Sequence, residues 1–174
     1  MGDTTITVIA IFLAAILMFV FPLMTLSDRS DDVSQLSVQT TTTEFVDNVK
    51  KTGKLTEENY GKFVEQISAT GNTYDVELKV QILDENLGKK ASTVAMDKIG
   101  ENQYYTMYTT QVLDAMNNSS KALTLKEGDR ISVNVKNTNT TISQQLKNFL
   151  YKVTGNDSYQ ISAESSGLVT VNGK

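Results

Sequence analysis

The chain has 174 residues and a net charge of −4, from 16 Lys and Arg and 20 Asp and Glu. These few and dispersed cations argue against a nucleic-acid partner, which requires clustered positive charge. Cysteine and histidine are both absent, so the chain has no disulfide framework, no thiolate nucleophile and no histidine base or ligand. We therefore expect neither a metal ion nor a cofactor.

Residues 6–26 form an uncharged apolar stretch, ITVIAIFLAAILMFVFPLMTL. At about 1.5 Å per residue, a helix of this length matches a hydrocarbon core of roughly 30 Å. A cleaved signal peptide would need a basic start and a shorter apolar run, whereas residues 1–5 contain no Lys or Arg. We expect a retained transmembrane helix and a single-pass membrane protein.

The charges that follow this stretch give little information on orientation. Arg29 is outnumbered by Asp28, Asp31 and Asp32, so the positive-inside rule has almost nothing to count. The composition rich in Ser, Thr and Asn is typical of exported proteins, and we expect the C-terminal domain to be extracytoplasmic. We interpret the four charges as solvated interfacial charge, and a divalent-cation site as the weaker alternative.

A helix is expected to continue beyond the membrane, over residues 4–51. Pro22 lies within the apolar run and predicts a kink, because proline removes a backbone donor. Lys50 and Lys51 suit a helix C-terminus, and Gly53 is expected to end the helix. A partial apolar stripe makes the second half amphipathic: Val33, Leu36, Val38, Phe45, Val46 and Val49.

The first part of the remaining chain predicts two helices and two strands. Thr56 is a good cap for a helix with the apolar stripe Tyr60, Phe63, Val64 and Ile67, ended by Gly71. Strict alternation predicts a strand over residues 74–82. Residues 85–100 read as a connection, residues 103–109 as a second strand, and residues 111–116 as a short helix.

The last part predicts a hairpin, a helix and two strands. Leu123 and Leu125, a turn at residues 126–129, and Ile131, Val133 and Val135 predict a β-hairpin. Thr141 is expected to cap a helix that carries Ile142, Leu146, Phe149, Leu150 and Val153. A turn at residues 155–157 leads to a strand over residues 159–163, and Ser165-Ser166-Gly167 is expected to turn into another over residues 168–171.

These elements predict an α+β fold: a long N-terminal hydrophobic helix, then a small head of helices packed on a mostly antiparallel sheet. The expected division is residues 1–52 for the transmembrane helix and stalk, and residues 53–174 for the head. No catalytic constellation stands out, because the adjacent acids Glu57/Glu58 and Asp84/Glu85 suit a helix start and a strand end. We expect no enzyme and no small-molecule substrate.

The arrangement of the first 50 residues resembles bacterial type IV pilin-like proteins, and more narrowly the pseudopilins of Tad-type systems in Firmicutes. The stretch TTITVIAIFLAAILMFVFPLMTLSDRSDDVSQ carries the resemblance, with Asp3 and Pro22 as its markers. The resemblance implies a structural subunit of a surface filament or secretion-type apparatus, whose partners are copies of itself or other pilin-like subunits and membrane lipid.

The same resemblance implies roles for particular residues. Asp3 would set the register against the N-terminal amine of a neighbouring subunit, and Pro22 would mark the helix bend. Helix packing would use Ile6, Ile9, Leu13, Ile16, Val20, Phe45 and Val49. The alternative is a membrane-tethered binding or sensor domain with no filament role, whose anchor any apolar helix could replace.

Overall fold

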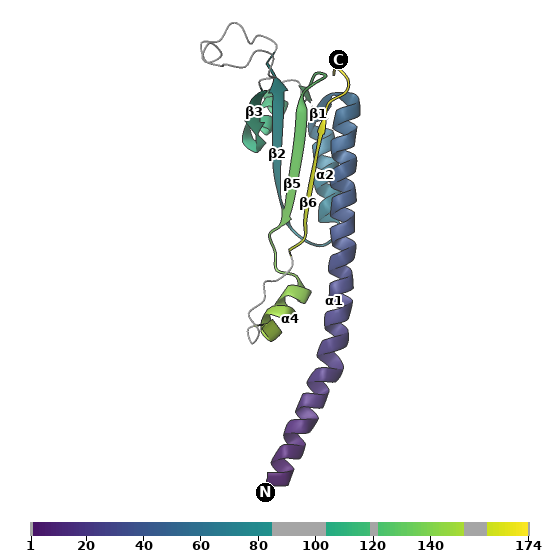
Figure 1. The fold of residues 1–174 in the computed structure, drawn as a ribbon, viewed down its shortest axis with the longest axis vertical. Helices are drawn as coiled ribbons and strands as arrows, with labels where there is room; N and C mark the ends of the chain where they lie inside the picture. The colour runs from purple at the N-terminus through teal and green to yellow at the C-terminus, as the bar shows by residue number, and fades with distance from the viewer. Residues whose placement is uncertain (1, 85–103, 119–121, 152–159, 174) are drawn as a thin grey trace, which may run out of the picture.

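One helix, α1 (Gly2–Thr52), runs along the long axis of the molecule, and the rest of the chain packs beside its second half (Figure 1). The computed structural model describes residues 2–84, 104–118, 122–151 and 160–173. It confirms the continuous helix expected over residues 4–51. Pro22 lies inside α1, and the axis of the helix bends in its N-terminal half (Figure 1).

Gly53 ends α1, and two separate features of this position favour glycine. Its φ of 63° lies in the left-handed region that favours glycine, and its N–H donates to the carbonyl of Val49 at 2.8 Å. A Cβ at this position would also lie 2.5 Å from the backbone nitrogen of Gly173 and 2.7 Å from the carbonyl oxygen of Val171. The chain end therefore packs directly against the turn that follows α1.

The head contains a four-stranded antiparallel sheet in the order β3-β2-β5-β6. Its strands are β2 (Tyr74–Leu83), β3 (Tyr104–Tyr108), β5 (Arg130–Asn137) and β6 (Ser162–Leu168). A two-stranded sheet pairs β1 (Lys54–Thr56) with β4 (Ala122–Thr124). The remaining helices are α2 (Glu57–Ser68), α3 (Thr109–Asn118) and α4 (Ile142–Tyr151). The predicted α+β class is thus confirmed.

The second half of α1 forms part of the core of the head. Val38, Val46 and Val49 are at most 1% exposed, in one cluster with the inward side chains of the central strands. The ring of Phe45 stacks on that of Phe63 in α2, with centroids 4.5 Å apart and an interplanar angle of 16°. Because burying one such side chain contributes roughly 1.5–3 kcal/mol, this half of the helix is integral to the head.

Several local predictions are confirmed at their expected positions. The Oγ1 atom of Thr56 accepts a hydrogen bond from the N–H of Asn59 at 3.1 Å, capping α2. Thr141 caps α4 in the same way through the N–H of Gln144 at 3.2 Å, and the Gln144 side chain accepts from the N–H of Thr141 in return. This reciprocal pair is a capping box. Strands β2 and β3 and helix α3 also lie where the sequence predicts them.

The predicted hairpin over residues 123–135 is wrong. Its turn exists, with the N–H of Asp129 donating to the carbonyl of Lys126 at 3.1 Å. However, β4 pairs with β1, whereas β5 pairs with β2 and β6. The N–H of Leu125 donates to the carbonyl of Gly53 at 2.7 Å, so contacts with the end of α1 draw this segment away from its sequence neighbour.

The predicted turn at residues 165–167 is also wrong, because β6 runs straight through it and Gly167 pairs with Ile131. The small residues serve a close approach instead: a Cβ on Gly167 would lie 2.3 Å from the Cδ of Lys50 on α1. Val33 and Leu36, predicted in the apolar stripe, are 69% and 65% exposed. The predictions for residues 85–103 and 152–159 fall outside the described residues.

Candidate assembly surface and polar clasp

The first half of α1 is an exposed apolar surface. It contains an 18-residue window of mean hydropathy 2.8, none of which is buried within the structure. The helix is long and apolar enough to cross a membrane. Of the residues predicted to pack against other helices, Ile6, Ile9, Leu13 and Ile16 are 49–66% exposed and Val20 is partly exposed. These five remain available to a partner.

Phe45 and Val49 differ from the other five predicted packing residues. They are 6% and 0% exposed, because they pack inside the chain's own head. Phe45 and Val49 are therefore not available to a partner, whereas the five residues in the N-terminal half of α1 are.

Asp3 lies in the exposed first turn of α1. Its backbone carbonyl accepts a hydrogen bond from the Thr7 hydroxyl at 2.8 Å, and its carboxylate lies near the positive end of the helix dipole. An acid at this position stabilises a helix by about 0.3–1 kcal/mol. A local role of Asp3 in the helix start therefore exists beside any role in assembly.

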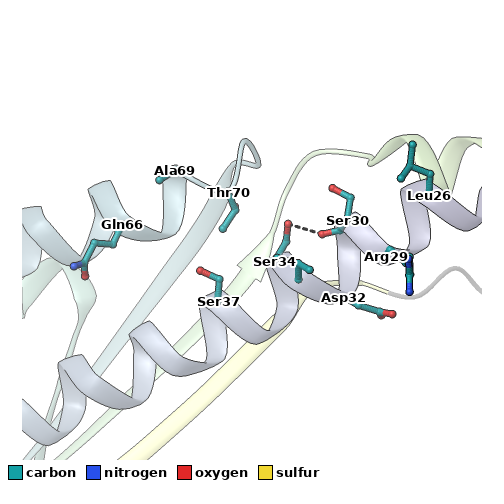
Figure 2. A pocket seen from close by; sticks show the side chains of 10 residues that line it. Leu26, Arg29, Ser30, Asp32, Ser34, Ser37, Gln66, Ala69 and Thr70 are labelled. Carbon is teal, nitrogen blue, oxygen red and sulfur yellow. Dashed lines mark hydrogen bonds between the residues drawn. The ribbon is translucent and has the colours of Figure 1, made fainter. Parts of the chain in front are cut away.

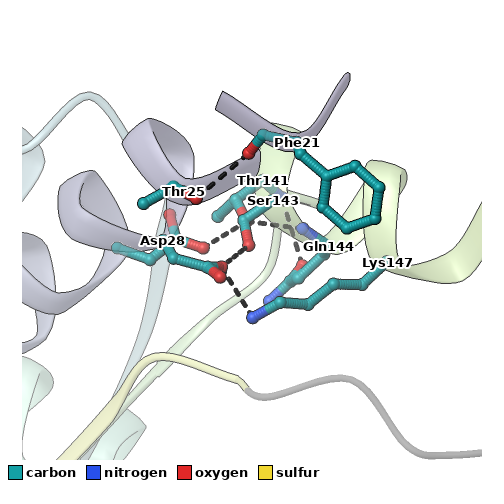
Figure 3. A network of polar contacts seen from close by, with 8 residues as sticks. Phe21, Thr25, Asp28, Thr141, Ser143, Gln144 and Lys147 are labelled. Carbon is teal, nitrogen blue, oxygen red and sulfur yellow. Dashed lines mark hydrogen bonds and ion pairs between the residues drawn. The ribbon is translucent and has the colours of Figure 1, made fainter. Parts of the chain in front are cut away.

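A cluster that we call the polar clasp joins α1 to α4 just beyond the apolar stretch (Figure 3). It consists of Asp28 and Asp31 on α1, Thr141 at the cap of α4, and Ser143 and Lys147 on α4. Lys147 Nζ lies 2.6 Å from the carboxylate of Asp28, which also accepts a hydrogen bond from the Ser143 hydroxyl. The Thr141 hydroxyl donates to the carboxylate of Asp31 at 2.7 Å.

The electrostatics of the clasp favour an ionised Asp28. The hydrogen bond from Lys147 holds the pKa of Asp28 below its usual value, and the hydrogen bond from Ser143 acts in the same direction. Both aspartates also contact the first turn of α4, where the helix dipole favours negative charge. The Asp28 side chain is 35% exposed, so its ion pair is worth at most about 1 kcal/mol.

Gln35 adds a second attachment, one turn further along α1. Its side-chain amide donates to the carbonyl of Ser162 at 2.6 Å and accepts from the N–H of Ser162 at 2.9 Å. The amide thus occupies the position of a strand backbone at the start of β6. Together with the clasp, it fixes both ends of the segment between β5 and β6 to α1.

The sequence interpretation of Asp28 and Asp31 as solvated charge is wrong, because both side chains bind α4. A signal was present: Asp28, Asp31 and Gln35 follow the i, i+3, i+7 spacing of one helix face. That spacing identifies a polar contact face but not the segment that it contacts. Across the described ranges, no three acidic side chains gather in a way that could hold a metal ion.

A groove of about 1050 Å³ lies beside α1, at the end of α2 (Figure 2). Gln66, Ala69 and Thr70 line it from the α2 side, facing Ser30, Ser34 and Ser37 of α1. Val33 also lines the groove, which explains why this residue is absent from the core.

No family model, no curated protein and no solved structure matches the chain.

Proposed function

We propose that the chain is a structural, pilin-like subunit or accessory pseudopilin, anchored by residues 6–26 and displaying its head outside the membrane. One observation carries the proposal: a single helix is apolar and exposed in its first half, and forms core of the head in its second half. The surface filament or secretion-type apparatus is the setting that the resemblance of the first 50 residues implies.

The exposed apolar surface needs a cover. Leaving an apolar side chain in water rather than burying it costs roughly 1.5–3 kcal/mol, and α1 exposes more than ten of them, from Ile6 to Leu26. Lipid covers such a helix when it is alone in a membrane, and other helices cover it in an assembly. Both environments are consistent with the length of the segment.

The continuity of α1 favours assembly over simple tethering. A tethered domain works with a flexible linker between anchor and head, whereas here Val38 and Phe45 join the core of the head on the same helix that carries the anchor. The head therefore has a defined orientation relative to the apolar segment. A subunit that packs through its helix gains from this, since each packed helix then sets the position of one head.

Asp3 and Pro22 take their proposed roles from the resemblance. Asp3, exposed at the start of α1, would pair with the N-terminal amine of a neighbouring subunit. Pro22 would allow the bend that lets apolar halves converge while heads stay apart, which is consistent with the curved axis of α1 in its N-terminal half (Figure 1).

Replacing residues 6–26 by polyleucine tests the proposal. Polyleucine keeps the hydrophobic anchor and the head but removes the side-chain pattern that helices need for specific packing. We expect membrane insertion to persist and higher-order assembly, seen by electron microscopy and chemical cross-linking, to disappear. Unchanged assembly of the polyleucine variant would disprove a specific role of this helix.

The groove between α1 and α2 favours one alternative, a membrane-tethered binding or sensor domain. Its volume of about 1050 Å³ is ample for a small ligand or a peptide segment. This alternative predicts that the polyleucine variant keeps its function and that a head lacking residues 2–26 binds its ligand unaided. The polyleucine experiment therefore separates the two functions.

A further inference from the structure

The first turn of α4 exposes its apolar residue and buries the polar ones, which is the reverse of the usual pattern for a surface helix. The polar residues of its cap and first turn are buried, with Thr141, Ser143 and Gln144 exposed by 6%, 1% and 8%. The apolar residue between them, Ile142, is 62% exposed. This inversion arises because the polar clasp turns the hydroxyl side of α4 towards Asp28 and Asp31.

Leu146 extends the outward apolar side of α4. At about 100° per residue, Leu146 lies roughly 40° around the helix from Ile142, and it is partly exposed. Lys147, which pairs with Asp28, lies a further 100° or so around the helix. The apolar side of α4 is therefore separate from the side that holds α1.

The clasp also determines the height of α4 along α1. Asp28 and Asp31 follow Leu26 by two and five residues, which is about 3–8 Å along the helix axis. The polar layer on each side of a bilayer is about 5–8 Å thick, the difference between a total of 40–45 Å and a core of 30 Å. Figure 1 shows α4 beside α1, displaced from the sheet towards the apolar half.

We infer that α4 is an interfacial foot that inserts Ile142 and Leu146 into the headgroup–acyl boundary of the membrane that α1 enters. The inference rests on the membrane anchoring in the proposed function. The lipid is favoured as the occupant because the apolar side of α4 begins where the exposed apolar surface of α1 ends. An amphipathic helix in such a position buries its apolar face about 5–10 Å into the interface.

The foot would fix the tilt of the head. A helix that crosses a bilayer alone can rotate and tilt, and interfacial contacts restrict both motions. Because the clasp holds α4 on one side of α1, the contact of α4 with the membrane surface would always lie on that same side of the anchor. The four-stranded sheet would then stand at a set angle above the surface.

The chain has no tryptophan, so one substitution creates a unique depth reporter. The test uses full-length Ile142→Trp in nanodiscs of phosphatidylcholine brominated on the acyl chains near the glycerol. The matched control is Asn148→Trp, which is exposed on the same helix and lies about 160° around it from Leu146. Phe19→Trp, within the apolar stretch and 72% exposed, reports on the anchor.

The expected result is a blue-shifted emission and a several-fold loss of intensity for Ile142→Trp in brominated lipid, with little loss for Asn148→Trp. Equal quenching of the two, or a blue shift of Ile142→Trp without quenching, would overturn the inference; the second result would mean that protein covers α4. Phe19→Trp distinguishes a failure of this inference from a failure of the proposed membrane anchoring, since an unquenched Phe19→Trp would refute the anchoring itself. If Ile142→Trp melts below the parent protein, a spin-labelled Ile142→Cys gives the same depth in this cysteine-free chain.

Discussion

Asp28 of α1 and Lys147 of α4 form an ion pair of 2.6 Å across 119 residues of sequence, and the Asp28 carboxylate accepts a further hydrogen bond from Ser143. This contact attaches the segment between β5 and β6 to α1 directly above the apolar stretch. It holds α4 against α1. Its removal should therefore loosen α4 while leaving the sheet intact.

Asp28→Asn should increase the opening of α4. The substitution removes the charge that pairs with Lys147, and a partly exposed ion pair contributes about 0.2–1 kcal/mol. A loss of 1 kcal/mol raises the open population about fivefold. Hydrogen exchange over residues 142–151 should therefore speed up by at most that factor, while exchange in β2 and β5 stays unchanged. Glu44→Gln, which removes a carboxylate at an exposed position of α1 far from the clasp, is the control and should have no effect.

The clasp should weaken in acid. Because the folded pKa of Asp28 lies below its unfolded value, with the Lys147 hydrogen bond as the main cause, its contribution is complete above the ordinary aspartate pKa of about 3.9. The contribution is lost as the pH falls through the lowered folded pKa. Asp31 and Asp32 also flank this region on α1, while Lys147 stays protonated throughout. A carboxyl titration followed by NMR should place the Asp28 midpoint below 3.9 or so.

Lys147→Met is the matched test of that assignment. It removes the main cause of the lowered pKa while keeping most of the aliphatic side chain, so the Asp28 midpoint should move upward towards its ordinary value. An unchanged midpoint would mean that another group holds Asp28 ionised.

Gly53→Ala should destabilise the head strongly. Alanine pays about 1–2 kcal/mol in the left-handed region, and its Cβ would lie 2.5 Å from the Gly173 nitrogen. We expect the urea midpoint of unfolding to fall by more than the left-handed backbone conformation alone would cause, because the Cβ clash adds to that cost. Gly61→Ala is the control in the opposite direction: Gly61 lies inside α2 with nothing within 4 Å of an added Cβ, so alanine should stabilise by about 0.5–1 kcal/mol.

The two halves of α1 should respond differently to truncation. Phe45→Ala removes a buried ring that is 6% exposed and stacks on the ring of Phe63. It should lower the stability of the head by about 3–5 kcal/mol. Phe12→Ala, at 68% exposure on the same helix, should leave the unfolding of the head unchanged. A comparable loss in both variants would mean that the apolar half contributes to the fold of the head.

Local patterns predicted helices better than they predicted strand partners. The cap at Thr56 and the stripe of Phe63 and Ile67 depend on neighbours within one or two turns, and the sequence contains them in full. The pairing of β4 with β1 depends on the distant contact between Leu125 and Gly53, which alternation of Leu123 and Leu125 cannot reveal. The same limit applies to the clasp, since Asp28 and Asp31 share a helix face in the sequence but their partners come from α4.

Asp3→Asn should weaken assembly without changing the fold. The substitution removes the carboxylate that would pair with a neighbour's N-terminal amine, and it changes the helix start by only about 0.3–1 kcal/mol through the dipole. Cross-linking and electron microscopy in membranes should therefore show fewer or shorter assemblies, with head melting unchanged. Thr4→Asp in the Asp3→Asn background restores an acid in the first turn at a different angle; it should recover the helix start but not assembly. Full assembly of Asp3→Asn would mean that the acid serves α1 alone, and recovery by Thr4→Asp would mean that net charge, rather than register, is what assembly requires.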